Sequence, residues 1–136
     1  PSPDSTAAGA PRTGTVLLVE DEPAVRLVAA QQLGLAGFRV HEVPNGEQAL
    51  RILAKPDHAI DVVVTDVVMP VMGGPELYAA VQRAGASPPF VFISGHAPED
   101  VLSQLAASIA VTILRKPWRG EQLIDAVRAA LSADQT

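Results

Sequence analysis

The chain has 136 residues, of which 48% are hydrophobic and 4% aromatic, and its formal net charge is −5. This length suits one domain with a single aliphatic core, and the composition excludes an intrinsically disordered chain. The absence of cysteine excludes disulfides, thiol catalysis and thiolate metal sites, while the acidic balance and the lack of a Lys/Arg run argue against direct nucleic-acid binding.

The two ends of the chain differ in composition from its middle. Residues 1–15, PSPDSTAAGAPRTGT, show no hydrophobic periodicity and are rich in Pro, Ser, Ala, Gly and Thr. Such a segment cannot bury enough apolar surface to order itself, so we expect a flexible linker or tail there, a domain over residues 16–132 and a short tail over 133–136. Because no initiating Met is present, we expect a chain that is processed or cut from a longer protein. With no apolar stretch of membrane-spanning length and no signal-like leader, we expect a cytoplasmic protein without membrane contact.

The first half of the domain alternates between strand and helix patterns. An apolar run predicts a strand at Val16–Val19, and Pro23 then begins a helix that Gly37 ends. One face of this helix is expected to carry Val25, Val28, Ala29, Leu33 and Ala36. The segment Phe38–Val43 alternates apolar and polar residues at first, which is typical of a half-exposed edge strand. Asn45 is a good N-cap for the helix that follows.

The second half continues the same alternation. Strands are predicted at Ile60–Thr65, Phe90–Ile93 and Val111–Leu114, and helices from Gly74-Pro75, from Pro98 and over Gly120–Leu131. Five strands that are each followed by a helix predict an α/β fold, in which helices cover both faces of a doubly wound (βα)5 parallel sheet.

Five polar residues lie where predicted strands end: Glu20, Asp21, Asp66, Ser94 and Lys116. In an open parallel sheet the carboxyl ends of the strands lie along one edge, where the ligand crevice forms, so we expect these residues to converge. Three carboxylates that would otherwise repel one another indicate a site for a hard cation. The hydroxyl of Ser94 and the ammonium of Lys116 fit an anion bound beside that cation, such as a phosphoryl group.

The acids and the serine of this cluster also have simpler explanations, whereas a surface role is not expected for Lys116, one of two lysines, at a strand end before a proline. Asp66 alone is compatible with a solvated acid at a strand end, and Ser94 alone with a turn residue. Glu20, Asp21 and Glu22 precede a predicted helix, whose N-terminus favours negative charge. Taken one at a time, these residues leave both explanations open.

Four segments together resemble the signature segments of response-regulator receiver domains: VLLVEDEP, VVVTDVVMPVMGG, FISGHA and ILRKPW. They occur in the order and at the spacing typical of that family, and the resemblance covers roughly residues 16–131. It implies a flavodoxin-like sheet with strand order 2-1-3-4-5 and a phosphorylatable module of two-component signalling.

The resemblance implies a role for each residue of the phosphoryl site. Asp66 matches the phosphoacceptor, whose carboxylate attacks phosphorus and forms an acyl phosphate. Ser94 matches the hydroxyl that hydrogen-bonds the phosphoryl oxygen. Lys116 matches the ammonium that pairs with the phosphoryl group, or with Asp66 before phosphorylation.

The resemblance also implies Mg²⁺ as the cofactor, a cation that needs few protein ligands because it keeps several waters. Glu20 and Asp21 match the acidic pair that holds it. The implied ligands are Asp21 and Asp66 directly, Glu20 through water, and the backbone carbonyl of Val68. Glu22 is left out of the implied site, because the helix N-terminus alone accounts for it.

Residues beside the implied site add further expectations. Receivers commonly carry an aromatic residue three positions before the lysine; that position is Ile113 here, so the aromatic half of the usual switch is absent. His96 lies at the rim of the site, where it either influences the attacking water or is simply an exposed loop residue. The Lys116-Pro117 peptide is expected to be cis, as is usual in the family. Trp118 is expected to pack beside it, partly buried.

These interpretations predict a receiver domain that takes a phosphoryl group from a histidine kinase or a histidine phosphotransfer domain. Such a domain catalyses only its own phosphorylation and dephosphorylation. The SGHAPED and RKPW stretches resemble receivers attached to sensor kinases, which favours a hybrid histidine kinase as the parent protein, and we expect a monomer. A stand-alone regulator and a pseudo-receiver that never carries phosphate are the alternatives. A phosphatase-type hydrolase fits less well, because its nucleophile usually follows the first strand, whereas Asp66 follows the third.

Overall fold

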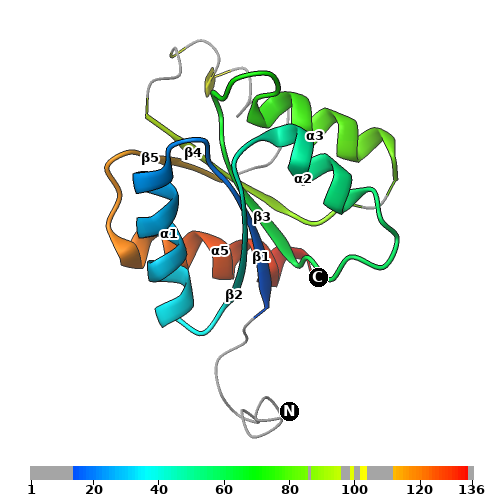
Figure 1. The fold of residues 1–136 in the computed structure, drawn as a ribbon. Coiled ribbons are helices and arrows are strands. Elements are labelled where there is room, and N and C mark those ends of the chain that lie inside the picture. Colours follow the sequence, from blue (N-terminus) through cyan, green and yellow to red (C-terminus); the bar gives the residue numbers. More distant parts are fainter. Residues whose placement is uncertain (1–13, 86, 96–98, 100–101, 104–111, 135–136) are drawn as a thin grey trace, which may run out of the picture.

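The computed structural model describes residues 14–85, 87–95, 99, 102–103 and 112–134. The strands are β1 (Thr15–Val19), β2 (Arg39–Val43), β3 (Val62–Asp66), β4 (Phe90–Ser94) and β5 (Thr112–Arg115), and the helices are α1 (Pro23–Leu35), α2 (Gly46–Leu53), α3 (Gly74–Arg83) and α5 (Gly120–Asp134) (Figure 1). All five strands form one parallel sheet in the order β2-β1-β3-β4-β5. The predicted α/β fold and its strand order are therefore confirmed.

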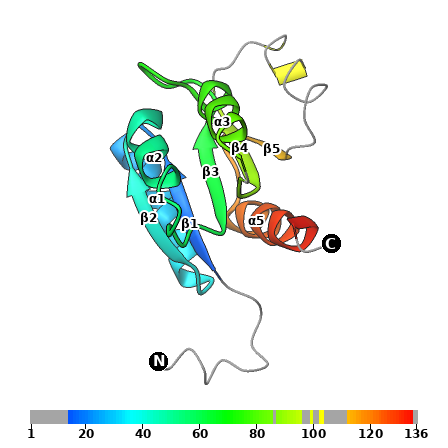
Figure 2. The same ribbon diagram turned by 90° about the vertical axis from the view of Figure 1, so that its right-hand side faces the viewer.

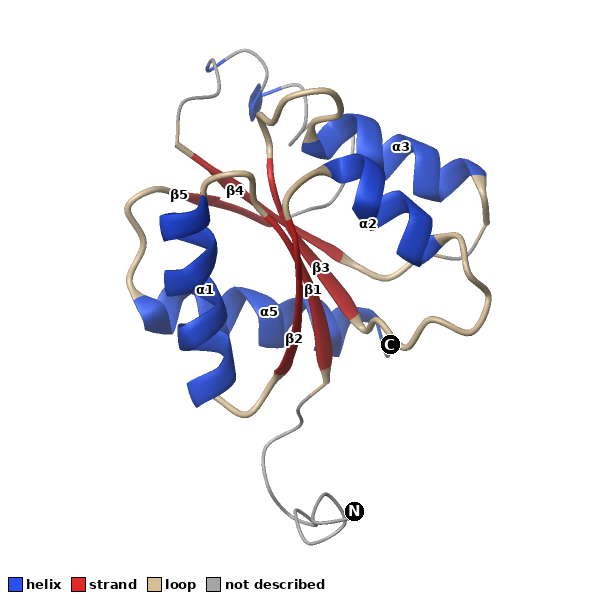
Figure 3. Ribbon diagram, in the orientation of Figure 1, coloured by secondary structure: helices blue, strands red, loops and turns tan. Residues whose placement is uncertain are grey.

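The sheet lies between two helical layers, with α1 and α5 on one face and α2 and α3 on the other (Figures 2 and 3). Successive side chains of a strand point to opposite faces. Thus Leu18 joins the core beneath α1 and α5, while its neighbour Leu17 joins the core beneath α2 and α3. Burial of apolar side chains on both faces of the sheet holds the strand ends at fixed positions.

Central and edge strands differ in burial as the sequence predicted. Every residue of β3 and β4 is buried, because helices cover both of their faces. In β2, at the edge of the sheet, only Val43 is buried. The alternating pattern of Phe38–Val43 was therefore interpreted correctly as an edge strand.

The local signals at helix ends are also observed. Asn45 caps α2, since its side chain accepts a hydrogen bond of 2.8 Å from the backbone N–H of Gln48. Gly37, two residues beyond α1, has a φ of 101°, a conformation that glycine adopts at little cost.

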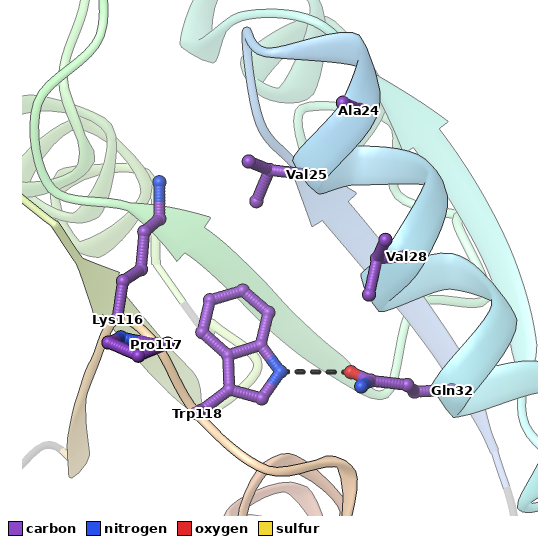
Figure 4. Close-up of a pocket in the computed structure, with 7 residues that line it drawn as sticks. All are labelled: Ala24, Val25, Val28, Gln32, Lys116, Pro117 and Trp118. Carbon is purple, nitrogen blue, oxygen red and sulfur yellow. Dashed lines mark hydrogen bonds between the residues drawn. The ribbon is translucent and has the colours of Figure 1, made fainter.

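Several element bounds and the exposure of one side chain differ from what the sequence suggested; β3, for example, is Val62–Asp66 and not Ile60–Thr65. β1 begins at Thr15, one residue inside the expected tail, and α5 continues to Asp134. Of the apolar face expected on α1, Val28 is not covered by the core: it is 49% exposed and lines a surface groove (Figure 4). Ala29 and Leu33, on the same expected face, are buried.

Some expectations concern residues outside the described ranges. They are the tail over residues 1–13, the rim position of His96, and most of the helix expected from Pro98.

Candidate functional site

The carboxyl ends of four strands bring the predicted site residues to one edge of the sheet. Glu20 and Asp21 follow β1, Asp66 ends β3, and Ser94 ends β4. Lys116 follows β5, and its backbone N–H donates to the carbonyl oxygen of Ser94 at 2.7 Å. Because β3 lies between β1 and β4, Asp66 is at the centre of this set. The structure therefore brings together the residues that the sequence predicted to converge.

Three acidic side chains at this edge are close enough to hold one cation. Carboxylate oxygens of Glu20, Asp21 and Asp66 lie within 4.8 Å of one another. Glu20 is fully buried and Asp66 is 5% exposed, and Oε1 of Glu20 has no hydrogen-bond partner among the described residues. A buried carboxylate is costly unless its charge is neutralised, and the nearby ammonium, Nζ of Lys116 at 3.4 Å from Oε1, is shared with Asp66. This all-oxygen donor set, with three carboxylates and one ammonium, fits a hard cation such as Mg²⁺.

The ammonium of Lys116 lies among the carboxylates. Its Nζ donates a hydrogen bond to Oδ2 of Asp66 at 3.2 Å and lies 3.4 Å from Oε1 of Glu20. Although burial lowers the pKa of Lys116, the negative charges of Asp66 and Glu20 outweigh it and raise that pKa above its ordinary value. Lys116 is therefore a permanent cation at this site.

Glu22 is a neighbour of the site that the sequence analysis left out. Its Oε1 lies 3.7 Å from Nζ of Lys116, although the Glu22 side chain is 62% exposed. Three consecutive acids at a turn, Glu20, Asp21 and Glu22, were the available signal. The helix N-terminus explained Glu22 equally well, and only the position of Lys116 across the sheet distinguishes the two explanations.

Glu20 is the most perturbed titratable group of the site. Its burial raises the pKa of the Glu20 carboxyl to about 7, while the backbone N–H of Glu22, which donates to Oε2 at 3.1 Å, acts in the opposite direction. The charge of Asp66 raises this pKa further, and Lys116 lowers it. An additional cation beside Glu20 would favour its ionised form.

The loop after Asp66 is held close behind the site. A Cβ atom at Gly74 would lie 2.5 Å from the carbonyl oxygen of Asp66 and 2.9 Å from the ring of Phe92. Because glycine has no Cβ atom, the start of α3 can approach Asp66 this closely. Val68 donates its backbone N–H to Oδ1 of Asp66 at 3.4 Å. The role of the Val68 carbonyl as a metal ligand stays a prediction.

The same loop presents apolar side chains to solvent. Val68 is 53% exposed and Val71 is 89% exposed. Val71 has a φ of 71° at the centre of a γ-turn, in which the N–H of Met72 donates to the carbonyl oxygen of Pro70 at 2.7 Å. A positive φ is unfavourable for a β-branched residue, so the turn is strained.

A groove of about 350 Å³ begins at Lys116 and runs between α1 and the segment that follows β5 (Figure 4). Val25 and Val28 line it on the α1 side, and Trp118 lines it on the other. The indole N–H of Trp118 donates to Oε1 of Gln32 at 2.9 Å across the groove. Trp118 is half-buried and the Lys116-Pro117 peptide is cis, as expected. The site therefore has an apolar surface beside it.

Ile113 lies three positions before Lys116, where receivers commonly carry an aromatic residue. It is half-buried in β5 and packs against the core on the α2 and α3 side of the sheet.

Among the described residues, no helix combines the length and the apolar character that a bilayer crossing requires.

Comparison with known proteins relates this fold and site to signalling modules. The chain is 39% identical to the sensor kinase CckA of Brucella abortus, over 88% of this chain and 13% of that protein. It is 38% identical to the positive alginate biosynthesis regulatory protein of Pseudomonas aeruginosa, over 85% of this chain and 46% of that protein. The chain thus spans less than half the length of either relative.

Solved structures agree with these sequence relatives. The receiver domain of the hybrid histidine kinase CckA has a TM-score of 0.70 at 35% identity and matches 87% of this chain and 99% of that domain. The chemotaxis protein CheY4 of Vibrio cholerae has a TM-score of 0.75 at 29% identity, over 88% of this chain and 100% of that protein. The family model for the response regulator receiver domain matches residues 16–128. With this match, the shared fold and the acidic site at the sheet edge, the chain belongs to the response regulator receiver domain family.

Proposed function

We propose that this chain is a phosphoacceptor in a two-component phosphorelay, in which Asp66 takes a phosphoryl group from a phosphohistidine. The environment of Asp66 carries this proposal. Its carboxylate belongs to an acidic cluster suited to Mg²⁺ and also accepts a hydrogen bond from Lys116. A carboxylate between a cation site and an ammonium is well placed to attack phosphorus, because positive charge on both sides stabilises the transferring group.

The transfer requires one bond to form and one to break. An oxygen of Asp66 attacks phosphorus as the P–N bond to the donor imidazole breaks, and the bonding electrons return to the imidazole nitrogen. Lys116, now paired with Asp66, is close enough to pair with a phosphoryl oxygen. Ser94, 4% exposed at the end of β4, is expected to donate its hydroxyl hydrogen to another.

The proposed metal ligands are those that the family resemblance implies, and the acidic cluster supports three of them. Asp21 and Asp66 are proposed as direct ligands of Mg²⁺, Glu20 as a ligand through water, and the carbonyl of Val68 as the backbone ligand. When bound, Mg²⁺ offsets the negative charge of the phosphoryl group. The buried Glu20 carboxylate, with an oxygen within 4.8 Å of oxygens of Asp21 and Asp66, supports its place near the cation.

The proposed donor is a histidine kinase or a histidine phosphotransfer domain. A donor that brings its imidazole to Asp66 covers the surface around the site, and two apolar areas are exposed there: Val68 with Val71, and the groove beside Trp118. The similarity to a CckA receiver supports a hybrid kinase as the parent protein. The aliphatic Ile113 supports a domain that acts as a monomer.

Phosphorylation with a small donor tests the proposal directly. Incubation with Mg²⁺ and acetyl phosphate should add one phosphoryl group, labile to alkali and to hydroxylamine as an acyl phosphate is, and Asp66→Asn should abolish the addition. Asp57→Asn is the matched control, because Asp57 is exposed in the turn before β3, at the other edge of the sheet. Equal labelling of Asp66→Asn would remove the assignment, and an unlabelled parent protein would support a pseudo-receiver.

A further inference from the structure

We propose that Arg26, supported by Glu42, is a positioning residue that holds the loop between β1 and α1 in the shape required by the cation site. The inference rests on the proposed Mg²⁺-dependent function. Nη1 of Arg26 donates to the carbonyl oxygen of Glu20 at 2.7 Å, and its Nε lies 3.5 Å from Oε1 of Glu42. The Arg26 side chain is only 22% exposed, so these contacts are partly shielded from water.

These contacts fix the Glu20 backbone from both sides. The N–H of Glu20 donates to the carbonyl oxygen of Val43 at 3.2 Å, and its carbonyl accepts from Arg26. Val43 and Glu42 both belong to β2, so this strand is the support for both contacts. Because a peptide unit is planar, the direction of the Glu20 carbonyl also sets the position of the Asp21 Cα atom.

The loop needs such support because its acidic side chains repel one another and the nearby Asp66. Glu20, Asp21 and Glu22 are consecutive acids, and two of them lie within 4.8 Å of the Asp66 carboxylate. Lys116 offsets this repulsion from the β5 side of the site. Arg26 acts on the backbone behind the acids, where it restrains the loop without occupying a carboxylate oxygen that a cation needs.

Charge and geometry predict opposite effects for substitutions of Arg26. As a charge near the site, Arg26 repels Mg²⁺, so its removal would strengthen metal binding. As a fork with donors in fixed directions, it orients the loop, so its removal should weaken metal binding. Arg26→Met removes both charge and donors but keeps an apolar stem. Arg26→Lys keeps the charge but cannot reproduce the fork.

A Mg²⁺ titration followed by the amide NMR shifts of Asp21 and Asp66 tests the inference, with thermal unfolding to check the fold. We expect Arg26→Lys and Arg26→Met both to weaken Mg²⁺ binding by about tenfold, a typical effect of losing a group that orients metal ligands. Glu42→Gln should weaken it in the same direction by a smaller factor. The Glu42→Gln variant also keeps the inference testable if Arg26→Met does not fold.

The pair Arg51–Glu47 on α2, with Nη2 and Oε1 3.8 Å apart, offers matched controls. Arg51→Lys and Glu47→Gln should leave the Mg²⁺ dissociation constant unchanged. The inference is overturned if Arg26→Lys binds Mg²⁺ like the parent protein, even with a lower melting temperature, or if Arg26→Met binds it more tightly. A parent protein that binds no Mg²⁺ would instead refute the proposed function on which the inference rests.

Discussion

The edge of the sheet formed by the amino ends of the strands and the edge formed by their carboxyl ends differ in how well their polar and charged groups are satisfied. A hollow of about 530 Å³ lies between α2 and α3 and reaches the residues that precede β3, where His58 Nδ1 accepts the N–H of Ile60 at 3.2 Å and Asp61 accepts the N–H of Thr15 at 2.8 Å. The groove beside the opposite edge is smaller, at about 350 Å³. That edge, however, holds three clustered carboxylates, with which the Lys116 ammonium makes two ion pairs. Unbalanced charge therefore locates the site better than the size of a hollow does.

Removal of a proposed metal ligand should give the largest difference between the two edges. Asp21→Ala deletes a ligand and a negative charge, so Mg²⁺ affinity should fall on the order of 100-fold. Asp61→Ala, at the other edge, should leave that affinity unchanged. Both affinities are measured by Mg²⁺ titration of folded protein. Equal affinities of Asp21→Ala and the parent would mean that Asp21 is only an acid at the start of α1.

The two lysines of the chain, Lys55 and Lys116, allow a second comparison. Lys116→Ala should lower the free energy of unfolding of the metal-free protein by about 2 kcal/mol, because it leaves buried acids without their cation. Lys55→Ala should have little effect, since Lys55 is exposed. Urea denaturation measures both.

The same lysine variant also tests signalling. In Lys116→Ala, phosphorylated and unphosphorylated proteins should have similar amide spectra in the loops after β4 and β5. Phosphorylation-induced shifts there that match those of the parent protein would contradict the proposed role of Lys116.

Glu20 should make the stability of the metal-free protein depend on pH. Burial raises its pKa from an ordinary value of 4.5 to about 7, so the protonated form is favoured by folding. Its contribution is fully present below pH 4.5 and is lost as the pH rises through 7. Glu20→Gln should remove this dependence and be more stable than the parent above pH 7, by on the order of 2 kcal/mol.

Urea denaturation of metal-free protein at pH 5 and pH 8 measures this effect. Glu47→Gln, in an exposed helical turn, is the control for neutralising a glutamate. A Glu20→Gln protein whose stability changes with pH as that of the parent does would show that Glu20 does not titrate in this range.

The smallest expected effect concerns self-association. Because Ile113 lacks an aromatic ring that swings inward, phosphorylation loses one source of differential interaction between two states. Sedimentation with Mg²⁺ and beryllofluoride, a phosphoryl mimic, should therefore still show a monomer. A complete conversion from monomer to dimer would refute this expectation.

The sequence predicted those features that depend on local pattern or on strand ends. Apolar runs located the strands, and parallel topology then placed Asp66, Ser94 and Lys116 at one edge. Asn45 could be predicted as a cap because its partner is three residues away.

Features that depend on distances between separate elements could not be predicted. The approach of Glu22 to Lys116, and the contact of Arg26 in α1 with Glu42 in β2, depend on how the elements pack. The exposure of Val28 has the same origin, because periodicity shows that a helix has an apolar face but not how much of it a neighbour covers.

The position of Trp118, which is hydrogen-bonded to Gln32 in the groove, has a practical consequence for spectroscopy. Trp118 is the one tryptophan of the chain, and its emission is therefore an unlabelled optical signal from the groove beside Lys116. Tyr78, the one tyrosine, packs edge-on against Phe90 on the other face of the sheet, with ring centroids 5.1 Å apart. Selective excitation of the indole can thus report events at one face of the sheet, while tyrosine absorbance follows the core of the other.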